Sequence, residues 1–298
     1  MPLENMPQGK FARQWHDILS SFSRKPLAVV GLILFILIVF MALFAPLIAP
    51  HDPVRQRLAD NLRPPVWSEG GTSEYLLGTD NFGRDILSRL IFGARVSLVA
   101  AGFASLFSMF VGITVGLIGG YFEGWVESLT MRIVDVFLAF PLILIALSLA
   151  SILGPNMRNL ILVMGLTGWM VYARVVRSEM VKLRNSEFII AAKVVGVPIP
   201  RLLLVHFLPN IIAPALVLFT FGFAQFIILE SALSFLGLGV PPPTPTWGRM
   251  LFDGRDFLTV AWWMITLPGV FIMLTALSLN FIGDGLRDAL DPRLRNIS

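Results

Sequence analysis

The residue types that most often carry out enzyme chemistry are few and scattered in this sequence. The three histidines, His16, His51 and His206, lie far apart, and there is no cysteine. The chain contains no H-E-x-x-H zinc motif, no G-x-S-x-G nucleophile motif and no G-x-x-x-x-G-K-[ST] phosphate-binding loop. We therefore expect no catalytic residue and no metal site, and any active process must draw its energy from outside the chain.

The stretch 187-EFIIAAKVVGVPIPRLLLVHFLPN-210 has the pattern of a small structural unit and stands between two strongly apolar segments. Glu187 lies where a helix dipole favours a carboxylate, and Gly196 can adopt the left-handed conformation that ends a helix. Two prolines then prevent simple continuation, and Pro209 fits the first turn of the next helix. The pattern predicts helix, turn and helix, in which the small Ala191-Ala192 pair lets a partner approach closely. By local chemistry alone, an ordinary surface helix explains these residues equally well.

The composition predicts that these residues belong to a polytopic membrane protein. Of 298 residues, 56% are hydrophobic and 14% are charged, and the mean hydropathy is +0.77, whereas soluble domains are about 25% charged. A helix needs about 20 apolar residues to cross a bilayer, and no strand alternation indicates a barrel. We expect an all-α chain with six transmembrane helices. The expected spans are residues 27–49, 96–119, 131–153, 159–175, 209–230 and 262–284.

Basic residues indicate the orientation, because cytoplasmic loops carry the excess of lysine and arginine. Both termini and the loop after the fourth span are basic, and six crossings place all three on one side. We expect cytoplasmic tails at 1–26 and 285–298, a first span with an extracytoplasmic region at 27–95, and a core of five spans at 96–284. The long 50–95 region also holds arginines, but acidic residues balance them. The basic residues used here are Lys10, Arg13, Arg24, Lys25, Arg174, Arg177, Lys182, Arg184, Lys193, Arg201, Arg287, Arg293 and Arg295.

Two outer regions have patterns of their own. In 83–98, apolar and polar residues alternate at helical spacing, which fits an interfacial helix leading into the second span or an ordinary lead-in without a function. The 231–261 region is rich in glycine and proline, which argues against one continuous helix. Its apolar start and Trp247 suggest a piece that dips toward the membrane or lies on it.

Ionisable residues within the expected spans are few, and such residues are often functional. Asp135 lies about one turn into the third span, and Arg132 three residues earlier favours a pair near the interface over a role in a transport pathway. Glu230 and Asp284 lie at the ends of expected spans, where water is accessible. Pro141, within the third span, predicts a kink.

The 187–210 stretch resembles the cytoplasmic signature of the permease subunits of binding-protein-dependent ABC importers. That signature reads E-A-A, three residues, Gly, nine residues, Ile, one residue, Leu-Pro. Ala191-Ala192, Gly196 and Leu208-Pro209 fall at the matching spacings. Ile190 stands where the general signature has Glu, and His206 where it has Ile, and both departures resemble the peptide and nickel branch of the family.

The resemblance covers nearly the whole chain. Residues 77–98, 230–248 and 283–295 look like the C-type permease of dipeptide, oligopeptide and nickel importers, and residues 26–53 look like its extra first span. The resemblance implies the ABC importer permease fold. It also implies that 231–261 could dock the binding protein, although packing across the outer face of a permease pair is an equal alternative.

In this family the patterned loop is the coupling helix, which seats in a groove on an ATPase and transmits ATP-driven closure to the membrane helices. The resemblance implies a second related permease subunit, two cytoplasmic ABC ATPases that bind the ATP, and an extracytoplasmic substrate-binding protein, assembled in the bilayer of a bacterial inner membrane. No cofactor of the chain's own is expected, and a net charge of +4 does not by itself suggest nucleic acid. The implied coupling residues are Glu187, Ala191, Ala192, Lys193, Gly196, Arg201, His206, Leu208 and Pro209.

The resemblance favours small peptides as the substrate, with nickel, glutathione or oligosaccharides as alternatives within the same class. An ion-coupled secondary transporter working without ATPases is the alternative from another class, but it would usually need ionisable groups near the midplane and paired repeats with broken helices. A membrane scaffold or sensor that recruits a signalling protein through this loop is a third. Neither explains the 187–210 spacing together with the other three stretches.

Overall fold

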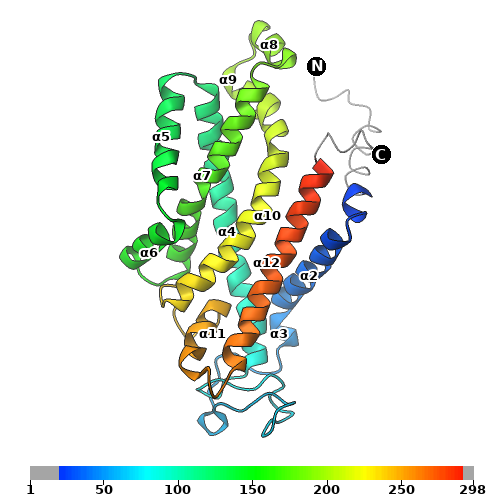
Figure 1. The fold of residues 1–298 in the computed structure, drawn as a ribbon, viewed down its shortest axis with the longest axis vertical. Coiled ribbons are helices and arrows are strands. Elements are labelled where there is room, and N and C mark those ends of the chain that lie inside the picture. The colour runs from blue at the N-terminus through cyan, green and yellow to red at the C-terminus, as the bar shows by residue number, and fades with distance from the viewer. Residues whose placement is uncertain (1–19, 291–298) are drawn as a thin grey trace.

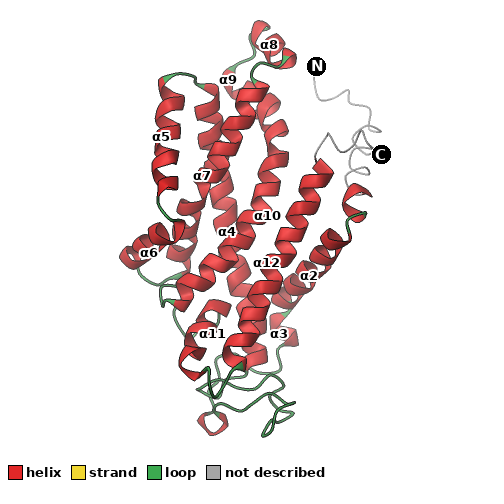
Figure 2. Cartoon of the chain, in the orientation of Figure 1, coloured by secondary structure: helices red, strands yellow, loops and turns green. Residues whose placement is uncertain are grey.

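The computed structural model describes residues 20–290, and the regular elements of this range are helices (Figures 1 and 2). His16, Lys10, Arg13, Arg293 and Arg295 lie outside the described residues. Three short helical turns, at Leu58–Asp60, Leu202–Phe207 and Arg255–Phe257, join longer elements. The α-helices are α2 (Pro26–Leu43), α3 (Ala45–Ile48), α4 (Ile86–Tyr121), α5 (Trp125–Ala139), α6 (Leu142–Leu153), α7 (Met157–Leu183), α8 (Glu187–Val194), α9 (Ile199–Arg201), α10 (Leu208–Phe235), α11 (Trp247–Gly254) and α12 (Trp263–Leu290).

The number of spans agrees with the polytopic fold expected from composition. Five helical stretches within residues 20–290 are long and apolar enough to cross a membrane, namely α2, α4, α7, the continuous stretch Ile199–Phe235 and α12. The pair α5 and α6 makes a sixth if it is counted as one span. The expected all-α polytopic architecture is confirmed, although α4, α7, α10 and α12 extend beyond the apolar segments read from the sequence.

The third expected span differs most from its prediction. Instead of one kinked helix over 131–153, α5 and α6 are bent by 89° at the break between them. Phe140, at the break, has an extended backbone (φ −95°, ψ 141°). A proline disfavours the helical conformation of the residue before it, so Pro141 ends α5 and begins a new helix in a different direction.

Helix α4 lies at the centre of the bundle and packs against α7, α10 and α2. Its contact with α7 is close because glycines face α7. A Cβ atom on Gly112 would lie 2.4 Å from the Cβ of Tyr172, and one on Gly116 would lie 2.6 Å from the Cβ of Val176. Such small-residue faces let membrane helices approach closely and gain van der Waals contact.

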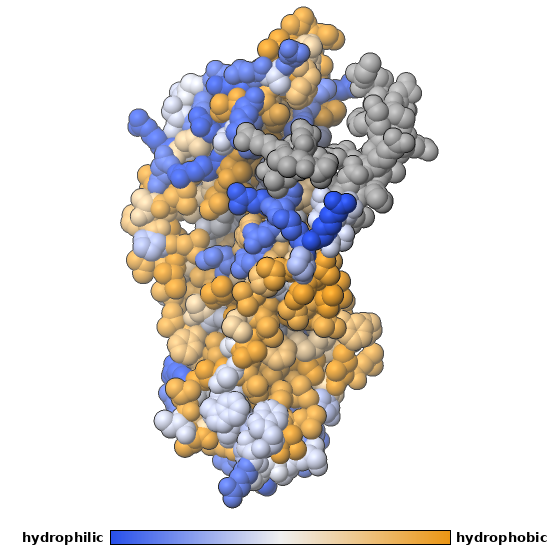
Figure 3. Space-filling view, turned by 45° about the vertical axis from the view of Figure 1, so that its right-hand side comes forward, coloured by the Kyte–Doolittle hydropathy of each residue, from blue (hydrophilic) through white to orange (hydrophobic). Residues whose placement is uncertain are grey.

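The molecule is elongated and has two different ends. One end carries α8 and the connection from α4 to α5, and the other carries α11 and the long 50–85 connection (Figure 1). We call them the α8 end and the α11 end. Hydrophobic side chains cover the middle of the surface, and hydrophilic side chains gather toward the α8 end (Figure 3).

Candidate functional site

The first part of the patterned loop forms α8, and its last turn has the expected glycine cap. Gly196 has a φ of +78°. The N–H of Val197 donates to the carbonyl of Ala192 at 3.1 Å, and the N–H of Gly196 donates to the carbonyl of Lys193 at 3.0 Å. These two bonds define a Schellman motif, which confirms the predicted helix end. A Cβ atom on Gly196 would meet nothing within 4 Å, so the backbone conformation, and not crowding, requires the glycine.

The second part of the loop does not form a separate helix. Helix α9 continues through a π-helical turn at Leu202–Phe207 into α10. Pro209 lies in the first turn of α10, as expected, but α10 is joined to α9 and is not a separate helix. Because Pro209 has no N–H, the carbonyl four residues earlier cannot be paired in an α-helical pattern. In the wider π-helical turn before Pro209, hydrogen bonds join residues five apart, and the N–H of Leu208 donates to the carbonyl of Leu203.

Buried apolar side chains fix this loop to the rest of the bundle. Ile189 of α8 and Phe207 of the π-helical turn are both 0% exposed. They belong to one cluster with Leu117 of α4 and Met180 of α7. The sequence did not distinguish these anchors, because Ile189 stands between Phe188 and Ile190 and Phe207 is followed by Leu208. This cluster connects α8 to α4, α7 and α10.

The opposite side of α8 is apolar and uncovered. Val194 and Val195 are 81% and 82% exposed, and Phe188 and Ile190 are exposed as well. These four residues, which we call the tip patch, lie beyond the hydrophobic band, and hydrophobic atoms are visible at the extreme α8 end among hydrophilic ones (Figure 3). Exposed apolar groups rimmed by polar residues mark interaction sites.

The structure brings the nine expected coupling residues together in this one loop, but not on one face. Ala191 is exposed, whereas Ala192 is half-buried against the anchoring cluster, so only the first of the two alanines is open to a partner. The ammonium of Lys193 lies 5.7 Å from the ring centre of Tyr121. The exposed members are Glu187, Ala191, Lys193, Gly196, Arg201 and Pro209, and the half-buried members are Ala192, His206 and Leu208.

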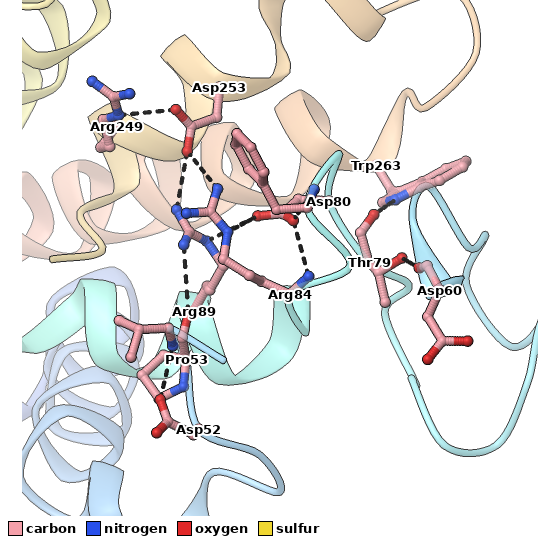
Figure 4. A network of polar contacts seen from close by, with 12 residues as sticks. Asp52, Pro53, Asp60, Thr79, Asp80, Arg84, Arg89, Arg249, Asp253 and Trp263 are labelled. Atoms are coloured by element: carbon pink, nitrogen blue, oxygen red, sulfur yellow. Dashed lines mark hydrogen bonds and ion pairs between the residues drawn. The ribbon is translucent and has the colours of Figure 1, made fainter. Parts of the chain in front are cut away.

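The α11 end holds a buried ionic cluster that the sequence reading did not predict (Figure 4). Arg84 Nε lies 2.5 Å from an oxygen of Asp80, and its terminal nitrogen lies 3.0 Å from Asp253. Arg89 reaches the same Asp253 oxygen at 3.1 Å, and Arg249 reaches the other at 2.9 Å. The cluster joins the 50–85 connection, the start of α4 and α11. Asp80, Arg84 and Arg89 are buried, and the side chain of Asp253 is 8% exposed.

Two expectations for the outer regions are tested by this packing. Residues 86–98 are the beginning of α4 itself, and their polar Ser88 and Arg89 are buried, so of the two alternatives the structure favours an ordinary lead-in to the span over an interfacial helix. Trp247 is 0% exposed and donates its indole N–H to the carbonyl of Leu90 at 3.0 Å. It therefore anchors α11 inside the protein and does not lie on the membrane. Leu90, the partner of Trp247, and Asp253, the partner of Arg89, each lie more than 150 positions away in the sequence. No local sequence pattern reveals these contacts.

Two ionisable residues also differ from their predicted surroundings. Glu230 lies inside α10 and is fully buried, and its carboxylate accepts hydrogen bonds from Ser97 at 3.0 Å and from Ser234 at 2.7 Å. It is not at a water-accessible end. Asp135 forms its ion pair with Arg174 of α7 and not with Arg132. Asp284 is exposed, as expected.

Known families and proteins match most of the chain. Residues 112–296 match the model of the binding-protein-dependent transport system inner membrane component family, and residues 13–65 match that of the N-terminal transmembrane domain of oligopeptide transport permease C. The di/tripeptide transport system permease protein DppC of Pseudomonas aeruginosa is 44% identical, covering 93% of this chain and 91% of that protein. The dipeptide transport system permease protein DppC of Escherichia coli K12 is 42% identical, covering 97% and 95%.

A solved structure shows a similar fold. The inward-facing MetNI methionine ABC transporter has a chain that superimposes with a TM-score of 0.56 at 16% sequence identity, covering 68% of this chain and 97% of its own. At this identity the likeness concerns the fold alone.

Proposed function

The chain belongs to the family of binding-protein-dependent transport system inner membrane components, and from this premise we propose that it passes dipeptides and oligopeptides inward through an ATP-driven importer. As a member of that family it is a multi-pass permease subunit of the inner membrane, and it works with ATPases and a substrate-binding protein. The names of the relatives support peptides over nickel, glutathione or oligosaccharides.

In our proposal the α8 end is cytoplasmic and the α11 end is extracytoplasmic. Basic residues support this orientation, since Lys182 and Arg184 end α7 beside α8, and Lys193 and Arg201 follow in the loop. In Figure 1 the start of α2 and the end of α12 both lie toward the α8 end. The 50–85 connection and α11 would then meet the loaded binding protein.

The observation that carries the proposed coupling is the tip patch on a rigidly anchored α8. We propose that one ATPase subunit covers this patch and that a second, related permease completes the pathway with its own ATPase. ATP is bound by those subunits, and this chain supplies no cofactor. Closure of the ATPases would push α8, and Ile189 and Phe207 would carry the displacement to α4, α7 and α10.

Purification from the native membrane in a mild detergent tests the assembly. The tagged chain should bring with it a second permease and P-loop ATPases, which mass spectrometry would identify. In proteoliposomes, the complete complex with its binding protein should take up dipeptides only when ATP is present inside. Recovery of the chain alone, together with uptake driven by an ion gradient, would contradict the proposal and support a secondary transporter.

A pair of glycines tests the coupling role. Gly196→Val places a side chain at a φ of +78°, with strain of about 1–2 kcal/mol, and we expect assembly without ATP-driven uptake. Gly154→Val is the matched control, because Gly154 also has a φ of +78° and an empty Cβ position, but lies at the end of α6. Equal loss of uptake in both variants, or none in Gly196→Val, would remove the loop from the coupling mechanism.

A further inference from the structure

An ion pair lies uncovered within the membrane-spanning part of the bundle. Asp135 of α5 pairs with Arg174 of α7, and their side chains are 63% and 53% exposed. Asp135 lies about 15 Å from the start of α5 and Arg174 about 14 Å from the end of α7, at 1.5 Å per residue. Both of these helix ends are at the α8 end (Figure 1). The pair is therefore well inside the spans and not at their margin.

Charged side chains at this depth are costly against lipid and face either the protein interior or water. This pair is not in the interior. The preceding residues, Val134 and Ala173, are buried together with Met170, so the backbones of α5 and α7 are fixed and direct both charges outward. A second pair on the same helices, Glu127 with Arg177, is nearer the α8 end and its carboxylate is only 17% exposed. The exposure of Asp135 and Arg174 thus indicates a surface that faces water.

Two hollows lie between α7 and α10. Val171, three residues before Arg174, lies on the same face of α7 as Arg174, whereas Val175, the residue directly after Arg174, does not. Val171 lines a hollow of about 250 Å³, and Val175 lines another of about 310 Å³. Leu218 and Phe221 of α10 line both hollows. Their walls are mainly apolar, and the larger one also contains Arg287 of α12.

We infer that Asp135 and Arg174 form a transient binding site for the two charged ends of a zwitterionic peptide in transit, which rests on the proposed function. The Arg174 guanidinium can bind a carboxylate through two N–H groups, and the Asp135 carboxylate can accept hydrogen bonds from an ammonium group. The two residues neutralise each other while the site is empty. The apolar hollows accept peptide side chains without selecting among them.

Thiol labelling tests whether the pair faces water, and an introduced cysteine is the only thiol of this chain, whose labelling is followed on the isolated subunit. In the complete complex in membranes, a charged methanethiosulfonate should label Asp135→Cys and Arg174→Cys. Leu37→Cys is the control, because Leu37 is an exposed residue of α2, which carries no charged residue and lies on the opposite side of the array from α5 (Figure 1). We expect labelling at positions 135 and 174 to be at least tenfold faster than at 37, and slower while dialanine is transported. Equal rates at the three positions would overturn the inference.

Uptake measurements separate a binding role from a structural one. Asp135→Asn and Arg174→Gln should lower dialanine uptake at least tenfold, while loaded binding protein still stimulates ATP hydrolysis. Glu127→Gln is the matched control on α5, and we expect uptake within about twofold of wild type. If Asp135→Asn and Glu127→Gln behave alike, or if Asp135→Asn also abolishes stimulated hydrolysis, the pair is only a tie between α5 and α7. If the wild-type complex takes up no dipeptide, the proposed peptide function fails. The labelling rates at positions 135 and 174 would still show whether the pair faces water.

Discussion

The two ends of the molecule are held together by different forces. At the α11 end, the buried Arg84 and Arg89 pair with the half-buried Asp253, which is far from them in the sequence. At the α8 end the charges pair at the surface, and the loop is fixed by buried apolar side chains such as Ile189 and Phe207. A buried ionic cluster is directional and loses several kcal/mol when one member is removed, whereas apolar contact is non-directional.

This difference matches what each end is proposed to do. A clamp with fixed geometry at the α11 end would keep α4, α11 and the 50–85 connection in register while the binding protein docks. An apolar anchor at the α8 end would carry a displacement of α8 to the bundle without breaking a specific bond. Substitutions that remove each kind of contact can test this contrast.

The largest expected effect is at the α11 end. Asp253→Ala leaves three arginines without their shared partner, two of them buried, and should destabilise the protein by about 3–5 kcal/mol. Asp256→Ala is the control, because Asp256 is exposed and lies 3.4 Å from Arg255, and its cost should be about 0–1 kcal/mol. Denaturant titration of the purified chain measures both. A similar loss of stability in both variants would show that the ionic cluster does not hold the α11 end in a fixed geometry.

A smaller, local effect is expected from the anchor of α8. Ile189→Ala removes a fully buried side chain and should cost about 2–3 kcal/mol, seen as faster amide hydrogen exchange across residues 187–197. Ile190→Ala removes an exposed neighbour and should leave exchange unchanged but weaken retention of the ATPase. If the two variants had the same exchange rates, the buried cluster would not be what holds the loop.

Much of this fold follows from the sequence because a bilayer restricts the chain to helices. Long apolar runs identified the spans, and glycine and proline in the 187–210 stretch identified the helix end at Gly196. The break at Pro141 was placed correctly but its size was not, because one proline permits a mild kink or a sharp bend, and the packing of α5 and α6 decides which.

The buried polar groups could not be predicted for a different reason. Arg89 looked like the polar face of an interfacial helix, and Glu230 looked like the end of a span, because each has apolar neighbours in sequence. The distant partners, Asp253 for Arg89 and Ser97 for Glu230, are more than 130 positions away. A pattern within a few turns of helix carries no information about such pairs, whereas the proposed coupling residues lie in one short loop, where the spacing of a motif can be compared directly.

The smallest effect should come from a charge pair at the α8 end. Arg184 lies 3.1 Å from Glu123, which is largely exposed, and such pairs contribute about 0–1 kcal/mol because water and salt screen them. Arg184→Gln should therefore shift the denaturant midpoint only slightly, and the shift should disappear at high salt. The same titration applied to Asp253→Ala should keep most of its effect in salt, because buried charges are screened much less. A large, salt-resistant loss in Arg184→Gln would mean that the α8 end is also held by an ionic clamp, and the contrast between the two ends would not hold.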